Sequence, residues 1–250
     1  MQRLSYGFAQ FYEEISPKGT VTMAHEFDLY TLYMFHSKVM VAFAKMLMHC
    51  EKFSTLDNKD KFLLFKNSWK LVVQLERHYS SAKYFGNSFD DLRLLHDNET
   101  AHDLSQFDQL RSHFYTHKAT SEKYYQLWIP HKHKMQELLM KPIKSLQLTE
   151  YEMVYLIAQT LWNVQYLENL SENARLVAEE VSEQINHEMH NYYVHEMGMV
   201  NYANRLVKLT KLIENNKIVL DSKRDVFVIA RIFELFDCDI TESELYDWKK

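Results

Sequence analysis

Turn-forming residues are scarce in this chain, which has only four glycines and three prolines among 250 residues. A sheet of many strands needs many tight turns, and such turns draw heavily on glycine and proline. The shortage therefore argues against a fold built mainly of strands. Helical periodicity runs through most of the sequence instead, so we predict an all-α fold in a single domain.

Cysteine is nearly absent, because Cys50 and Cys238 are the only two in the chain. Two cysteines cannot build a disulfide framework or a zinc finger, whose sites use more ligands of this kind. Both lie in apolar helical surroundings in the sequence. We therefore expect two buried thiols in a protein of a reducing compartment.

Long apolar runs and a strong net charge are missing too. No stretch offers the roughly 18 uninterrupted apolar residues of a membrane span. Glu13 and Glu14 interrupt the N-terminal segment, where a signal peptide would be apolar. The formal net charge of -5 comes from scattered charges of both signs, so the chain lacks a strong electrostatic footprint for nucleic acid or anionic membrane. We expect neither membrane binding nor direct DNA binding.

Catalytic and metal-binding motifs are also missing. His187 and Glu188 would begin a zinc-binding HExxH motif, but Asn191 stands where its second histidine belongs. One Glu-x-x-His pair, Glu99 and His102, occurs where a helical di-iron site needs two. The chain has no glycine-rich phosphate loop and no G-x-S-x-G elbow. We predict that it is not an enzyme and that it has no catalytic residues, no metal and no cofactor.

What the sequence does contain is a series of helical segments with short breaks. The stretch from Phe43 to Trp69 joins two of them through a polar break at 54–59, so these two helices must pack close together. Turn residues between Tyr84 and Leu95 separate short extended runs, which predicts a small β-hairpin followed by a loop. The predicted helices cover residues 1–14, 25–52, 60–83, 104–117, 121–141 with a break at Pro130, 149–162, 171–195, 202–216 and 226–236, with a tail at 241–248.

Local patterns add detail at four places. The apolar residues of 25–52 do not keep to one stripe, which predicts a central helix enclosed on most sides. Thr149 and Glu152 have the spacing of a capping box, and Ser171 is a second predicted N-cap. The polar residues 221–225 are expected to separate the last two long helices.

One set of residues resembles the signature of a known family. The second half of that signature is present at Phe53, Leu56, Asp60, Lys61, Leu64, Phe65 and Trp69. On these residues the chain resembles the ligand-binding domain of nuclear hormone receptors, and in particular the large group expanded in nematodes. Three further stretches are similar to that group: KPIKSLQLTEYEMVYL at 141–156, YANRLVKLTKLI at 202–213 and IARIFELFDCDITESELYDW at 229–248.

The resemblance implies an all-α, antiparallel three-layer helical sandwich around a ligand cavity, with one small β-hairpin. The domain would span 1–250, with the first helix and a linker over 1–24 and a C-terminal activation-type helix over 241–250. The family's DNA-binding zinc domain is not present in this chain, because two cysteines cannot supply the eight ligands of its two zinc modules. Any DNA contact would come through such a domain.

The implied function is transcriptional regulation in the nucleus, with the cytoplasm as a second location. A small lipophilic ligand, fatty-acid-like or sterol-like, would bias the last helix and thereby recruit coregulators. The alternative is an orphan dimerisation or coregulator-interaction module whose pocket is filled by side chains and takes no ligand. The candidate pocket residues are His36, Met40, Phe43, Leu71, Gln74 and Phe85, which would be ordinary core residues under the alternative.

Two protein-binding surfaces follow from the same resemblance. Coregulators would present leucine-rich helical peptides to a groove at Met48, Lys52, Phe53, Leu64, Phe65, Lys66, Glu244 and Leu245. In the family, a lysine and a glutamate hold the ends of that peptide; Met48 stands at the lysine position here, so Lys66 is the basic candidate. A homodimer, or a heterodimer with another nuclear receptor, would use Arg205, Leu206, Lys208, Leu209 and Leu212, unless this helix packs wholly within its own domain.

Overall fold

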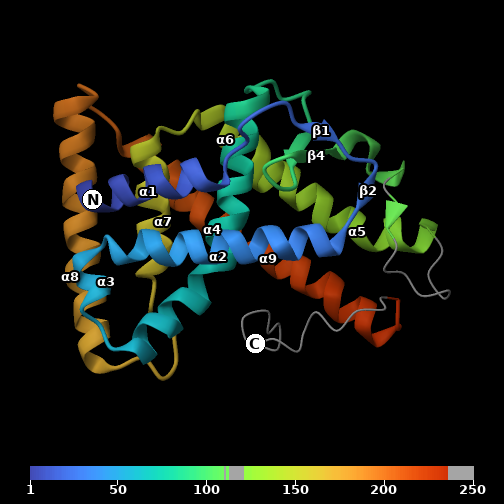
Figure 1. Cartoon of the computed structure of the whole chain (residues 1–250). Coiled ribbons are helices and arrows are strands. Elements are labelled where there is room, and N and C mark those ends of the chain that lie inside the picture. The colour runs from blue at the N-terminus through green and yellow to red at the C-terminus, as the bar shows by residue number, and fades with distance from the viewer. Residues whose placement is uncertain (110, 113–120, 236–250) are drawn as a thin grey trace. The chain divides into compact units, whose positions relative to one another are not determined.

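The computed structural model describes residues 1–109, 111–112 and 121–235, which are mainly helical (Figure 1). The α-helices are α1 (Gln2–Ile15), α2 (Leu29–Met48), α3 (Glu51–Ser54), α4 (Asn58–Phe85), α5 (Ser121–Met135), α6 (Lys141–Leu146), α7 (Glu150–Leu161), α8 (Glu172–Asn191) and α9 (Ala203–Ile232). A 3₁₀-helix, η1 (Leu104–Gln109), and two π-helical segments, η2 (Gln136–Met140) and η3 (Tyr192–Glu196), complete the helical part. The strands are β1 (Thr22–Met23), β2 (Glu26–Phe27), β3 (Arg93–Leu95), β4 (Thr100–Asp103) and β5 (Arg111–Ser112).

The backbone divides into two compact units. The first consists of Met1–Ser16, Ser37–Val73 and Leu148–Glu214, and the second of Pro17–His36, Gln74–Gln147 and Asn215–Lys250. The long helices α2, α4 and α9 each contribute residues to both units. The predicted all-α fold class is confirmed, while the three-layer arrangement stays a prediction.

Large apolar side chains fill the first unit. Phe43 lies between two other rings, with centroid distances of 6.1 Å to Phe11 and 5.7 Å to Phe65. Within this unit α1 packs on α7, and α7 packs on α8. Burial of one such side chain contributes about 1.5–3 kcal/mol to stability, so this aromatic core stabilises the unit. The face of α1 that it covers consists of Leu4, Phe8, Phe11 and Ile15.

Helix caps in the first unit lie where the sequence predicts them. The Thr149 hydroxyl accepts a hydrogen bond from the Glu152 amide at 3.2 Å, and Glu152 Oε2 accepts one from the Thr149 amide at 2.9 Å. Ser171 caps α8 by accepting from the Ala174 amide at 3.1 Å. The same serine donates from its amide to Asp60 Oδ1 at 3.0 Å and from its hydroxyl to Oδ2 at 2.5 Å. The buried Asp60 therefore joins the first turn of α4 to the start of α8.

Short strands form in the second unit, later in the chain than the predicted hairpin. Phe85 ends α4, and the antiparallel pair is β3 with β4, where Leu95 faces Ala101 across the turn. The predicted loop over 96–105 is therefore wrong, because β4 occupies its middle. β1 adds to β4 in parallel, and β2 pairs with β5 in parallel. Strands of two to four residues carry too little alternation for a sequence pattern to locate them.

Several other predictions need correction. Helix α2 is not enclosed on most sides, because Tyr30, Met34, Val41 and Met48 are exposed along one stripe. Cys50 is only half-buried, and its burial raises the pKa of its thiol; Cys238 lies outside the described residues.

Polar and proline positions did not end helices as expected. Pro130 lies inside α5, where the loss of one amide donor costs about 3 kcal/mol, an amount that the packing of neighbouring buried residues can offset. The polar residues 221–225 lie within the continuous α9, where Arg224 and Asp221 form an ion pair at 3.3 Å. The predicted helix over 104–117 is wrong in its described part, where residues 104–109 form η1 and residues 111–112 form β5. Residues 113–120 and the predicted tail at 241–248 lie outside the described residues.

Candidate functional site

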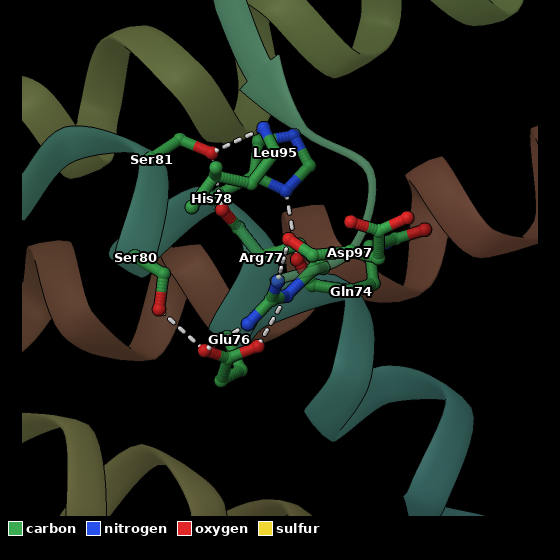
Figure 2. Close-up of polar contacts among 8 residues, drawn as sticks. All are labelled: Gln74, Glu76, Arg77, His78, Ser80, Ser81, Leu95 and Asp97. Carbon is green, nitrogen blue, oxygen red and sulfur yellow. Dashed lines mark hydrogen bonds and ion pairs between the residues drawn. The ribbon is translucent and has the colours of Figure 1, made fainter. Parts of the chain in front are cut away.

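A buried ion pair occupies the middle of α4 in the second unit (Figure 2). Arg77 Nε donates to Glu76 Oε2 at 2.6 Å, and Arg77 Nη2 donates to Glu76 Oε1 at 2.7 Å. Glu76 also accepts from the Ser80 hydroxyl. The side chains of Glu76 and Arg77 are 0% and 8% exposed, so the pair needs all of these hydrogen bonds to offset the loss of water.

The same arginine connects α4 to the sheet (Figure 2). Arg77 Nη1 donates to the Asp97 carbonyl oxygen at 2.8 Å, and the Leu95 amide donates to the Ser81 hydroxyl at 2.9 Å. The guanidinium carbon of Arg77 lies 4.7 Å from the centre of the Phe35 ring. A planar guanidinium that stacks and bonds in this way fixes its neighbours in one arrangement.

Helix α9 is held to α4 and to the segment of α5 and η2 by polar contacts within the second unit. Gln74 Nε2 donates to the carbonyl oxygen and to Oδ1 of Asn216, at 2.9 and 2.7 Å. Asn215 donates to the Leu138 carbonyl at 2.9 Å, and His131 Nδ1 is hydrogen-bonded to the Ser222 hydroxyl at 2.8 Å. These bonds hold α9 against α4, α5 and η2 within this unit.

Three histidines of the second unit lie near enough to Lys223 for its charge to act on them, and we name the four side chains the basic cluster: His36, His96, His131 and Lys223. Burial lowers the pKa of His36 to about 3, and the nearby basic groups Lys223, His96 and Arg77 lower it further. Burial also lowers the pKa of His131 to about 3 and that of His96 to about 4, with Lys223 acting on both. The three histidines are therefore neutral at pH 7, and Lys223 is the cluster's cationic member.

The six predicted pocket residues lie in different surroundings. Phe43 and Leu71 are buried in the core of the first unit, and Met40 of the same unit is partly buried. His36 and Gln74 belong to the second unit, where His36 is in the basic cluster and Gln74 binds Asn216. Phe85 is at the end of α4, not in the hairpin, and its ring lies 4.3 Å from the guanidinium carbon of Arg93. Their joint role in one pocket stays a prediction.

The described residues of the predicted coregulator groove all belong to the first unit. Met48 is exposed, and Phe65 and Lys66 are partly exposed. Phe53 and Leu64 are core residues, at 4% and 0% exposure. Lys52 forms an ion pair with Glu180 of α8 at 2.7 Å. Glu244 and Leu245 lie outside the described residues, and the groove stays a prediction.

The residues of the predicted dimer face on α9 differ in exposure. Leu209 and Leu212 are buried in the chain itself, so they cannot belong to an exposed apolar stripe. Arg205 Nη2 donates to Glu152 Oε2 at 2.7 Å, which holds this arginine within its own unit. Leu206 is partly exposed and Lys208 is exposed. The burial of two of the five residues favours the alternative that this helix packs within its own domain, and the dimer face stays a prediction.

Metal and membrane sites were not expected. Among residues 1–109, 111–112 and 121–235, no three His, Cys, Asp or Glu side chains lie close enough to hold a metal ion. No helix in that part of the chain is long and apolar enough to cross a membrane. The first unit has a cavity of about 570 Å³ whose rim includes the ion-paired Arg3, Glu51 and Lys52, so its charges are largely satisfied.

Sequence reasoning missed most of the basic cluster. The adjacent Glu76 and Arg77 within an otherwise apolar helical stretch are a usable signal of a buried ion pair. Lys223 gives no such signal, because it stands in a polar run that reads as solvated surface. His96 and His131 reach the cluster only through tertiary structure.

Comparison with known proteins assigns the chain to a family. Residues 17–233 match the family described as the ligand-binding domain of nuclear hormone receptor. The nuclear hormone receptor family member nhr-213 of Caenorhabditis elegans is 25% identical over 99% of this chain and 59% of its own length. The members nhr-54 and nhr-127 of the same organism are each 26% identical over 86% of this chain, which spans 52% and 61% of their lengths.

The match covers most of the residues of both units, and the relatives are receptors of one nematode. The chain spans between half and two thirds of the length of these relatives. The helical fold and the signature residues from Phe53 to Trp69 agree with that match. The chain therefore belongs to the nuclear hormone receptor ligand-binding domains, within the group expanded in nematodes.

Proposed function

We propose that this chain is the ligand-binding and coregulator-recruiting domain of a transcription regulator that acts in the nucleus. The observation that carries the proposal is the family match over residues 17–233. A ligand that fits one arrangement of the C-terminal segment better than others would stabilise that arrangement and, with it, the coregulator groove. DNA binding would belong to a zinc domain outside these 250 residues.

The ligand would be small and lipophilic, such as a fatty acid or a sterol. Polar groups set among apolar side chains select such ligands, because an unmatched buried donor or acceptor costs about 1–3 kcal/mol. The basic cluster and Gln74 are the polar groups of the second unit that support this role. A ligand present at 100 times its Kd would stabilise the fold by about 2.7 kcal/mol.

A second candidate is an interaction module without a ligand. It is favoured by Phe43, which is fully buried between Phe11 and Phe65 and thus serves as core. Such a module would act through coregulators or through a dimer with another receptor. Its thermal stability would not respond to lipophilic ligands, whereas that of a receptor would.

The groove is tested by binding of a fluorescent leucine-rich coregulator peptide, measured by anisotropy with and without a saturating lipophilic ligand. In the double variant, Met48→Lys replaces an exposed apolar side chain with a charged one, and Lys66→Glu reverses the charge of a partly exposed one. We expect this variant to weaken peptide binding at least about tenfold, since burying an unpaired charge is costly.

The matched control is Leu176→Lys, which places the same charge on an exposed leucine of α8. It should bind the peptide as the wild-type chain does. Unchanged binding by the double variant would show that the peptide docks elsewhere.

A further inference from the structure

Helix α9 has one side that faces solvent. The helix runs without a break from Ala203 to Ile232, so its own geometry determines which of its side chains share a side. Leu209 and Val219 are fully buried on its inward side. Val207 and Ile218 lie away from that side and are 65% and 47% exposed. Two branched apolar side chains of this helix therefore face solvent.

The exposed side of α9 has the spacing of a coiled-coil seam. Six exposed residues follow one another in alternating steps of three and four, and we name them the outer stripe: Asn204, Val207, Lys211, Glu214, Ile218 and Asp221. This spacing keeps them on one line along the helix, as at the a and d positions of a heptad. Within the described part of the chain, the side chains of Lys211 and Glu214 form no ion pair or hydrogen bond. Both charges are thus available to a partner.

The outer stripe is complementary to itself. It is symmetric about the point between Leu212 and Ile213, and the residues equally far from that point form three pairs: Val207 with Ile218, Lys211 with Glu214 and Asn204 with Asp221. A second copy of the helix, running antiparallel about a two-fold axis at that point, would place the two members of each pair opposite each other. Apolar side chains would then face apolar ones, and lysine would face glutamate.

The charges also select the direction of such a pairing. A parallel second copy in the same register would place Lys211 against the same lysine and Glu214 against the same glutamate. Like charges that face each other across an interface repel. The outer stripe therefore favours the antiparallel arrangement over the parallel one.

We propose that the chain forms a symmetric dimer through the outer stripe, with the two copies of α9 antiparallel. Val207 would lie against Ile218 of the partner subunit, and Lys211 against Glu214 of the partner subunit. This inference rests on the proposed function as a receptor domain, and it names the partner as a second copy of the chain. The surface differs from the predicted dimer face, which includes the buried Leu209 and Leu212.

The size of the outer stripe sets the expected affinity. From Asn204 to Asp221 the helix rises by about 26 Å. A contact of this size is small for a protein interface, so we expect a weak dimer with a Kd on the order of 10 µM. Sedimentation equilibrium of the 250-residue protein at about 5–200 µM brackets this value and measures the dimer directly.

Reversing one charge at a time tests the pairing. Lys211→Glu places a glutamate against Glu214 of the partner subunit, and Glu214→Lys places a lysine against Lys211 of the partner subunit. We expect each variant to weaken the dimer about tenfold or more, because each replaces attraction with repulsion at two symmetric positions. Lys59→Glu is the matched control, since it makes the same charge change at an exposed position of α4, and it should dimerise as the wild-type chain does.

A mixture of the two charge variants provides a rescue. In a heterodimer of Lys211→Glu with Glu214→Lys, every contact between these positions joins a glutamate to a lysine. The equimolar mixture should therefore dimerise as the wild-type chain does, although each variant alone does not. A variant that regains its dimer in the mixture must also be folded.

The apolar part of the outer stripe is tested separately. Val207→Ser removes an exposed apolar side chain at the seam and should weaken the dimer about tenfold. Leu176→Ser is the control, because it removes an exposed apolar side chain of α8 and should leave the dimer unchanged.

The outcomes separate this inference from the proposed function. A wild-type chain that stays monomeric throughout the concentration range overturns the inference, whichever other protein covers the outer stripe. Charge variants that dimerise as the wild-type chain does, or a mixture that stays monomeric, overturn it as well. None of these results decides the proposed function, which the peptide anisotropy measurement with a lipophilic ligand tests on the monomer.

Discussion

Two arginine–carboxylate pairs of the second unit show how burial changes the contribution of an ion pair to stability. Arg77 and Glu76 are closed off from solvent, whereas Arg93, which bonds to Asp91 at 2.6 Å, has a side chain that is 41% exposed. The exposed pair competes with water and contributes little to stability. The buried pair cannot lose one member without leaving the other charge unmatched.

Arg77→Met is therefore expected to lower the free energy of unfolding by about 3–5 kcal/mol, because it leaves Glu76 buried without its partner. Arg93→Met is the matched control, with an expected loss of about 1 kcal/mol or less. Urea unfolding followed by circular dichroism measures both. Equal losses in the two variants would contradict the account of the buried pair.

Single residues were predictable where their partners are near in sequence. Thr149 and Glu152 are three residues apart, and their reciprocal bonds are as expected. Asp60 and Ser171 were each singled out, but their contact joins residues 111 positions apart. Lys223 stands in a polar run of the sequence, whereas in the structure its charge acts on the distant His36, His96 and His131. Local pattern carries no information about such long-range pairs.

Elements with a helical repeat were predicted well, and the shortest ones poorly. The apolar face of α1 and the start of α8 follow from spacing and caps, whose physics is local. The parallel pairs β1 with β4 and β2 with β5 depend on residues far apart in the chain. The continuity of α9 also depends on tertiary contacts, since Ser222 gains a partner in His131.

The cap of α7 gives a prediction at this scale. Thr149→Ala removes the hydroxyl that accepts from the Glu152 amide and from the Tyr192 hydroxyl, which lies 3.0 Å away. We expect a loss of about 1–2 kcal/mol in the free energy of unfolding. Thr149→Ser keeps the hydroxyl and should lose much less. The account of the cap is wrong if serine and alanine are equally destabilising in thermal unfolding.

Across the whole molecule, buried histidines determine how stability depends on pH. Burial lowers the pKa of His78 to about 4, as it lowers those of His36, His96 and His131. The folded values lie below the unfolded value near 6.5, so the unfolded chain binds more protons as the pH falls through 6.5. The contribution of these histidines to stability should therefore be full above pH 7 and should decrease towards pH 5.

Each such histidine is expected to lower the free energy of unfolding by about 1 kcal/mol when the pH falls from 7 to 5.5. His131→Asn should reduce this decrease by about one quarter, because asparagine does not titrate. His187→Asn, at an exposed position of α8, is expected to keep the wild-type pH dependence. Unfolding free energies at the two pH values provide the comparison. A wild-type chain that is equally stable at both would contradict the placement of these histidines.

The central claim is that this nuclear receptor domain holds a small lipophilic ligand, and native mass spectrometry of the purified 250-residue chain tests it most directly. The account predicts a complex of one chain with one small lipophilic molecule that organic solvent extracts. A spectrum with the bare chain alone, together with no thermal shift from a panel of fatty acids and sterols, would contradict it.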